Sequence, residues 1–218
     1  MHKHLDFYLT TRYGELYRER FESMSRTCMC WGFECSDGWF HIIDNLSFRI
    51  THYYISKDTP SNIPAVGQVK EKFGTLRFYT SGDDTIHNLI SFAEDMSSVT
   101  CEICGKPAKT YRNGWHQTLC PDCYEKDSDT RFQPIELKEH SFVPGDSVTV
   151  LLNTTDGIIT KALKYVGFSD NYDIVERVID GVKIEQKVHF MYHPLFSYFV
   201  SDELYGLYLD RYERKTDE

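Results

Sequence analysis

Hydrophobic residues at helical spacing predict three helices in the first hundred residues. The first covers residues 5–24, where Leu, Tyr, Phe and Met positions recur every three or four residues and Arg and Glu occupy the other face. The second starts at Ser36 or Asp37, either of which can cap it, and runs to Ile50. The third carries its apolar residues from Ile86 to Met96, just before a cysteine motif.

Strand patterns occur in two places. Residues 66–80 alternate apolar and polar positions around Gly74, which predicts a β-hairpin. From residue 141 onward, β-branched runs separated by Gly and Asp-Gly turns predict a small, SH3-like β-barrel. The predicted class is therefore α+β, with a body of helices and a hairpin over residues 1–138 and a β-rich domain over residues 139–218.

Four cysteines give the clearest chemistry in the chain. Cys101 and Cys104 are separated by two residues, and Cys120 and Cys123 repeat this spacing after fifteen residues. Two such pairs can close a tetrahedron of thiolates around Zn²⁺, while two disulfides or four unrelated core thiols are the alternatives. A shell of four thiolates leaves no open coordination position, so we expect one structural zinc ion per chain and no catalytic role for it.

The residues around these cysteines predict a finger over residues 99–130. Gly105 lets the chain turn back after Cys104, as a zinc knuckle requires. A short hairpin with its turn at Asn113-Gly114 follows, and a helix then begins near Cys120. This order is that of a treble-clef finger, and a zinc ribbon with a second knuckle is the alternative.

Two further groups of residues are weaker site candidates. Cys28, Cys30 and Cys35 could form a second metal site with His41 or His52, although their spacing is irregular and ordinary packing also explains them. On the predicted hairpin, basic and aromatic residues interleave in a way that could hold phosphates and stack bases, but one charged face of a half-buried hairpin looks the same. These candidate binding residues are Lys70, Lys72, Phe73, Arg77 and Tyr79.

Composition narrows the classes of function. The net charge is −9, and none of the segments 1–100, 101–140 and 141–218 is net basic, which argues against a general nucleic-acid binder. No apolar run reaches the roughly 18 residues of a membrane-spanning helix, and the N-terminus lacks a signal core, so we expect no membrane association. Free cysteine pairs suit a reducing compartment, and a cytoplasmic location follows.

Three stretches together resemble a known family. They are Gly32 to Phe40, which reads GFECSDGWF, then Val69 to Tyr79, which reads VKEKFGTLRFY, and the finger from Cys101 to Cys123 with Trp115 inside it. This order resembles a family of uncharacterised proteins encoded by tailed bacteriophages and prophages, although Ser36 stands where many members have Gly. The resemblance covers about residues 30–125 and implies a small phage protein made in a bacterial cytoplasm, without implying an activity.

The sequence therefore favours a non-enzymatic, zinc-binding accessory protein of a phage. We expect it to bind a host macromolecule, most simply a host protein, in counter-defence or host takeover. One alternative is a nucleic-acid-binding module that uses the hairpin at 66–80 and the C-terminal barrel. A second alternative is an enzyme acting on a nucleotide or nucleic acid, although no catalytic motif is present and no catalytic residue is predicted.

Overall fold

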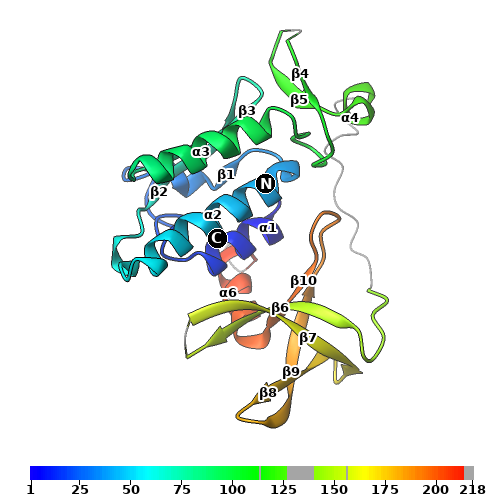
Figure 1. Ribbon diagram of the computed structural model, residues 1–218. Coiled ribbons are helices and arrows are strands. Elements are labelled where there is room, and N and C mark those ends of the chain that lie inside the picture. Colours follow the sequence, from blue (N-terminus) through cyan, green and yellow to red (C-terminus); the bar gives the residue numbers. More distant parts are fainter. Residues whose placement is uncertain (113, 127–139, 156, 214–218) are drawn as a thin grey trace. The chain divides into compact units, whose positions relative to one another are not determined.

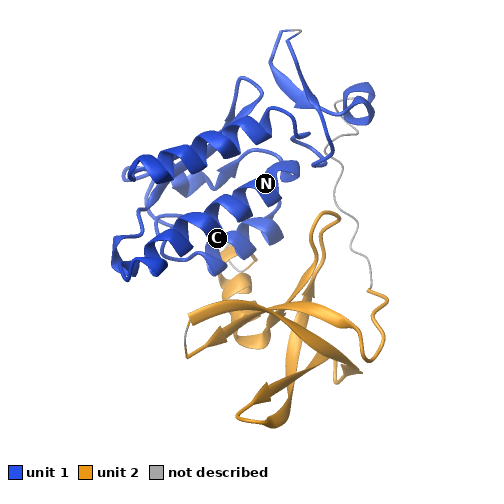
Figure 2. Cartoon of the chain, in the orientation of Figure 1, with its two compact units in different colours: residues 1–134 blue, residues 135–218 orange. Residues whose placement is uncertain are grey.

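The computed structural model describes residues 1–112, 114–126, 140–155 and 157–213 (Figure 1). The chain divides into two compact units, residues 1–134 and residues 135–218 (Figure 2). Each unit has its own buried core.

The three longest α-helices of the first unit and a three-stranded sheet form its main body. The helices are α1 (Lys3–Arg12), α2 (Phe40–Ser56) and α3 (Asp84–Ser97), and short 3-10 turns occupy Cys28–Trp31, Asp37–Trp39 and Pro60–Asn62. The predicted second and third helices are present and lie against each other, but α2 starts at Phe40, without a cap from Ser36 or Asp37, and continues past Ile50 to Ser56. The two helices bury five apolar side chains of the core: Ile43, Leu46, Ile50, Ile86 and Ile90.

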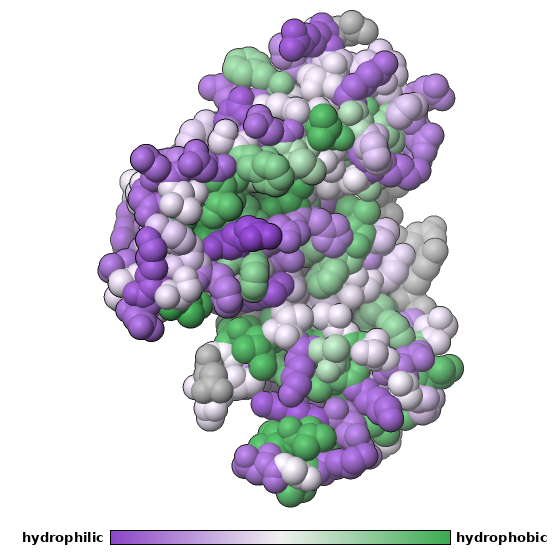
Figure 3. All heavy atoms as spheres, viewed as in Figure 1, coloured by the Kyte–Doolittle hydropathy of each residue, from purple (hydrophilic) through white to green (hydrophobic). Residues whose placement is uncertain are grey.

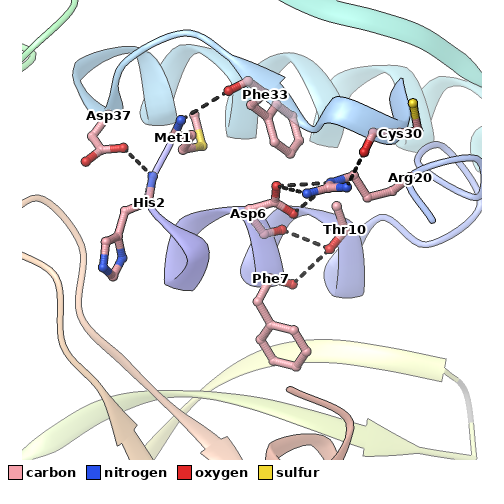
Figure 4. A network of polar contacts seen from close by, with 9 residues as sticks. All are labelled: Met1, His2, Asp6, Phe7, Thr10, Arg20, Cys30, Phe33 and Asp37. Atoms are coloured by element: carbon pink, nitrogen blue, oxygen red, sulfur yellow. Dashed lines mark hydrogen bonds and ion pairs between the residues drawn. The ribbon is translucent and has the colours of Figure 1, made fainter. Parts of the chain in front are cut away.

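The helix predicted over residues 5–24 is shorter than expected, since α1 ends at Arg12 and turns follow. Phe21 and Met24, which the pattern placed on the buried face, are 46% and 72% exposed. Within α1, Asp6 is buried because it forms an ion pair with Arg20, 2.9 Å between Oδ2 and Nη2 (Figure 4).

A three-stranded sheet contains the predicted hairpin. Its order is β1 (Phe33–Glu34), β2 (Val66–Lys72) and β3 (Thr75–Thr80), with β1 parallel and β3 antiparallel to β2. The turn is made by Phe73 and Gly74, whose φ angles are 57° and 77°, as a tight hairpin turn with two positive φ angles requires. Helix α3 closes the free edge of β3, where the N–H groups of Leu76 and Phe78 donate to side chains of that helix.

The segment after α3 holds a second, smaller hairpin and a short helix. Strands β4 (Lys109–Tyr111) and β5 (Gln117–Leu119) pair antiparallel, and α4 (Pro121–Glu125) follows. The expected turn at Asn113-Gly114 lies only partly within the described residues, because Asn113 is outside them. Residues 127–130 of the predicted finger are also outside the described part of the chain.

The second unit is a closed five-stranded barrel. Its strands are β6 (Ser147–Thr154), β7 (Gly157–Ser169), β8 (Tyr172–Ile179), β9 (Val182–Met191) and β10 (Tyr198–Ser201). They run as a meander of antiparallel neighbours, and β10 closes the barrel by pairing parallel with β6. Val148, Val150, Val175, Val188 and Phe199 are central members of the buried core. The predicted barrel is thus present, and its finer SH3-like assignment stays a prediction.

A C-terminal helix that the sequence analysis did not identify follows the barrel. Helix α6 (Asp202–Tyr212) begins directly after β10 and buries Leu204 and Tyr208. Among the helices of the described residues, none combines the length and apolar character needed to cross a bilayer.

Candidate metal centre

The first cysteine pair lies on a tight knuckle directly after α3. Gly105 has a φ of 75°, which is the left-handed conformation that glycine adopts without strain. Its N–H donates to the carbonyl of Cys101 at 2.9 Å, and the N–H of Cys101 donates to the carbonyl of Lys106 at 2.8 Å. These bonds fold the loop back, so that the side chains of Cys101 and Cys104 can point to one place.

The second pair lies at the start of α4. Cys120 is the residue before the helix, and Pro121 occupies the first helical position, where its missing N–H costs nothing. The N–H of Tyr124 donates to the carbonyl of Cys120 at 2.9 Å, which completes one helical turn. Cys123 is therefore brought back beside Cys120 by the geometry of the helix.

The four thiols meet in one cluster. The Sγ atoms of Cys101, Cys104, Cys120 and Cys123 all lie within 4.8 Å of one another, and those of Cys104 and Cys120 are 3.5 Å apart. Four thiolates bound to Zn²⁺ at about 2.3 Å would be about 3.8 Å apart at the corners of a tetrahedron. All four cysteines are free of disulfides, so the donor set fits a metal ion such as zinc.

The thiols also differ in how readily they ionise. Burial raises the pKa of Cys104 and of Cys123. Burial opposes the ionisation of Cys120 as well, but the N–H of Cys123 and the neighbouring thiols outweigh it, so the pKa of Cys120 is lowered. A bound cation would favour deprotonation of the thiols that it contacts.

Residues 36–39 hold the knuckle in place. The N–H of Gly38 donates to the carbonyl of Glu102 at 2.7 Å, and the N–H of Ser36 donates to the Glu102 carboxylate at 3.0 Å. The buried indole of Trp39 donates from Nε1 to the carbonyl of Thr100 at 2.9 Å. The chain before α2 therefore satisfies backbone groups on either side of the ligand Cys101.

The β2–β3 hairpin contacts the cluster's own hairpin. The hydroxyl of Thr118 on β5 donates to the carbonyl of Gly74 at 2.5 Å and lies 2.8 Å from the hydroxyl of Thr110 on β4. A Cβ at Gly74 would come within 2.9 Å of the Thr110 methyl group, so the approach is close. The ring centroids of Phe73 and His116 are 6.1 Å apart. The tip of the β2–β3 hairpin thus lies against the middle of the β4–β5 hairpin, with His116 beside Phe73.

Sequence reasoning missed the residues that join these parts. Gly38, Glu102 and Thr118 carry no local signal, because their roles depend on contacts with residues 44 to 66 positions away. The nearest signal was the resemblance, which picked out the three stretches that the structure brings together around the four cysteines.

The three candidates for a second metal site are not gathered. Cys28 is exposed, and Cys30 uses its carbonyl to accept a hydrogen bond from Arg20. Cys35 is buried, and that burial raises the pKa of its thiol, which disfavours the thiolate that a metal needs. Within the described residues, the four-cysteine cluster is the one group of three or more His, Cys, Asp or Glu side chains close enough to share an ion.

The candidate binding residues of the β2–β3 hairpin differ in their exposure and in the side chains that they contact. Lys70 and Arg77 face each other across the strands, but Arg77 is engaged by Glu94 of α3, 3.5 Å between Nη1 and Oε2. Lys70 lies over the ring of Tyr79, and Lys72 lies over the ring of Phe73. Phe73, at the turn, is 63% exposed. The most accessible of the candidate binding residues are therefore those at the turn of the β2–β3 hairpin.

The chain matches no protein-family model, and neither a curated protein nor a solved structure is significantly similar to it. The resemblance to phage proteins accordingly stays a prediction.

Proposed function

We propose that the four cysteines hold one structural Zn²⁺ in a treble-clef finger, and that the chain acts as a non-enzymatic binding protein. The observation that carries the metal assignment is the closed set of four thiols within 4.8 Å. A hairpin followed by a helix bearing Cys123 supports a treble clef over a zinc ribbon. Four thiolate ligands leave no position for a substrate, so the zinc serves the fold.

The surface that supports a binding role lies at the hairpin tips. Phe73 is 63% exposed and Trp115 is 74% exposed, and His116, the neighbour of Trp115 in the chain, contacts the ring of Phe73. Lys72 is exposed beside Phe73. We call these four residues the tip surface. Exposed aromatic residues on a rigid base are typical anchors of protein interfaces, where Trp contributes disproportionately to affinity.

A partner protein is the occupant that we favour for this surface. The phage resemblance adds a context for it, namely a host protein met in the bacterial cytoplasm. Nucleic acid is the second candidate, because Lys72 beside Phe73 is a pairing that can hold a phosphate and stack a base. The net charge of −9 weighs against it. The metal centre does not support an enzyme that acts on nucleotides, because its four thiolate ligands leave no coordination position for a substrate.

Affinity capture from bacterial lysate with quantitative mass spectrometry tests this function. A Phe73→Ala, Trp115→Ala double variant is compared with the wild-type chain and with Phe168→Ala, which removes an equally exposed phenyl ring from the barrel. We expect the wild-type chain and the Phe168→Ala control to enrich one protein that the double variant does not enrich. Treatment of the lysate with nuclease should not change this result. Captured material that disappears with nuclease and falls steeply between about 0.15 and 0.5 M salt would instead establish the nucleic-acid alternative.

A further inference from the structure

A groove runs between α2 and α3 on the first unit. One section of about 300 Å³ is lined by residues of both helices, and an adjoining section of about 260 Å³ continues it along α2. Arg49 and Leu89 line both sections, so the two form one continuous groove. Figure 3 shows hydrophobic side chains gathered over this part of the displayed face.

The two walls of the groove differ in chemistry. The α3 wall is apolar, with Leu89, Phe92 and Met96 at the spacing of one helical face. Phe92 is 65% exposed and Met96 is 41% exposed, which is unusual for side chains of this size in a row. The α2 wall carries an exposed polar stripe at intervals of three or four residues, formed by His41, Asn45, Arg49 and His52.

The charge of the groove is opposite to that of the chain. Neither section has an Asp or Glu in its lining, although the chain carries 33 of these residues and a net charge of −9. Asp44 pairs with Arg12 and Glu94 pairs with Arg77, while the exposed Asp95 of α3 is not part of the lining of either section. Arg49, in the middle of the groove, has no carboxylate within ion-pair distance among the described residues.

We propose that this groove binds an amphipathic helix of a partner protein that carries acidic residues along one edge of its apolar face. Apolar residues of that helix, three and four positions apart, would cover Leu89, Phe92 and Met96, as in other helix-in-groove complexes. An acidic residue beside them would pair with Arg49. This proposal goes beyond the function proposed above, because it concerns a separate surface and holds whether or not the tip surface binds.

The same features count against other occupants. A nucleic-acid strand needs several phosphate contacts for measurable affinity, and the groove offers a single full positive charge. A second copy of this groove would bring two Arg49 side chains together across a symmetric interface, which is unfavourable. An acidic helix satisfies both the apolar wall and the unpaired guanidinium.

Fluorescence anisotropy with two labelled model peptides tests the proposal on the full-length, zinc-loaded chain. Both peptides have about 18 residues, which matches the length of α2, with Leu at every third and fourth position. The remaining positions are mostly Glu in the first peptide and mostly Lys in the second. We expect saturable binding of the acidic peptide and at least about tenfold weaker binding of the basic one.

Substitutions in the groove test whether the peptides bind there. Arg49→Glu should weaken the acidic peptide by at least about tenfold and strengthen the basic one, because the charge that selects the peptide is reversed. A Phe92→Ala, Met96→Ala double variant should lose both peptides, and both changes are at exposed positions that the fold tolerates. Arg26→Glu makes the same change in net charge at an exposed position outside the groove and should leave affinity unchanged.

Several results would overturn the proposal. Equal binding of both peptides, no binding of either, or an unchanged affinity in Arg49→Glu would each show that the groove does not select an acidic helix. Sedimentation equilibrium gives a further check. A wild-type dimer that Phe92→Glu converts to a monomer would show that a second copy occupies the groove.

Discussion

A side chain at Gly38 would collide with the backbone of the metal ligand Cys101, since a Cβ there would lie 2.2 Å from the Cys101 carbonyl oxygen. The N–H of the same glycine donates to the carbonyl of Glu102 at 2.7 Å. Residues 36–39 and the cysteine knuckle are therefore in backbone contact, and only glycine permits it. This contact links the start of α2 to the metal centre.

Gly38→Ala should consequently destabilise the first unit by about 2–3 kcal/mol, because the neighbouring atoms are backbone and cannot rotate away. Urea unfolding followed by circular dichroism measures the change. Gly14→Ala is the matched control, since a Cβ there would meet nothing closer than 3.8 Å. If Gly38→Ala unfolds at the same urea concentration as Gly14→Ala, the close contact does not exist in solution.

Zinc content gives a direct test of the metal centre. We expect elemental analysis to find one Zn²⁺ per chain, and Cys104→Ser to lose it, because three thiolates hold the ion much less tightly than four. The variant and the chelator-treated wild-type chain should both unfold at lower temperature. Cys28→Ser removes an exposed thiol outside the cluster and should keep both the metal and the stability.

The zinc site would be contradicted if the purified wild-type chain contained no zinc, or if the four cysteines were joined in disulfides. The separation of 3.5 Å between Cys104 and Cys120 is too long for a disulfide bond of about 2.05 Å. Mass spectrometry after alkylation under denaturing conditions distinguishes the two cases.

The sequence was sufficient to predict those elements whose geometry depends on residues close together in the chain. The spacing of the four cysteines predicted the cluster, and Gly74 with alternating neighbours predicted the hairpin. Both depend on residues a few positions apart, whose geometry the backbone alone dictates. The helices after Trp39 and Asp83 were found for the same reason, because their apolar residues form one stripe.

Long-range pairing explains what the sequence did not reveal. The burial of Asp6 depends on its ion pair with Arg20, fourteen residues later in the chain, which no local pattern indicates. The barrel was predicted but its strand β10 was not, because β10 pairs in parallel with β6, 49 residues earlier. The groove on α2 and α3 was also invisible, because exposed and buried apolar residues look alike in a helical pattern.

The two units should be separable. The barrel has a core of its own, and the four cysteines with the parts that contact them lie wholly within residues 1–134. A chain ending at Pro134 should stay soluble and keep one Zn²⁺, and residues 140–218 alone should give the circular dichroism of a β-rich protein. Precipitation of the first fragment with loss of zinc would mean that the units share a core.

The buried pair of Asp6 and Arg20 should be the most strongly coupled ion pair of the first unit. Arg20 makes two-pronged contact with the Asp6 carboxylate and also donates to the carbonyl of Cys30 at 2.9 Å (Figure 4). Gly32 leaves just enough room, since a Cβ there would lie 2.7 Å from the guanidinium. Side-chain exposure is 15% for Arg20 and 6% for Asp6, so water screens the pair weakly.

A double-mutant cycle with Asp6→Asn and Arg20→Met measures this coupling. Each single change should cost about 3–5 kcal/mol, because it removes the opposite charge from a charged group that stays buried. The double change should cost less than the sum of the two, with a coupling of about 1–3 kcal/mol. Glu22→Gln and Arg26→Met give the matched cycle at an exposed pair, where the coupling should stay below about 1 kcal/mol. Equal couplings in the two cycles would show that the Asp6 carboxylate is hydrated in solution, and that burial of this pair does not fix the position of α1.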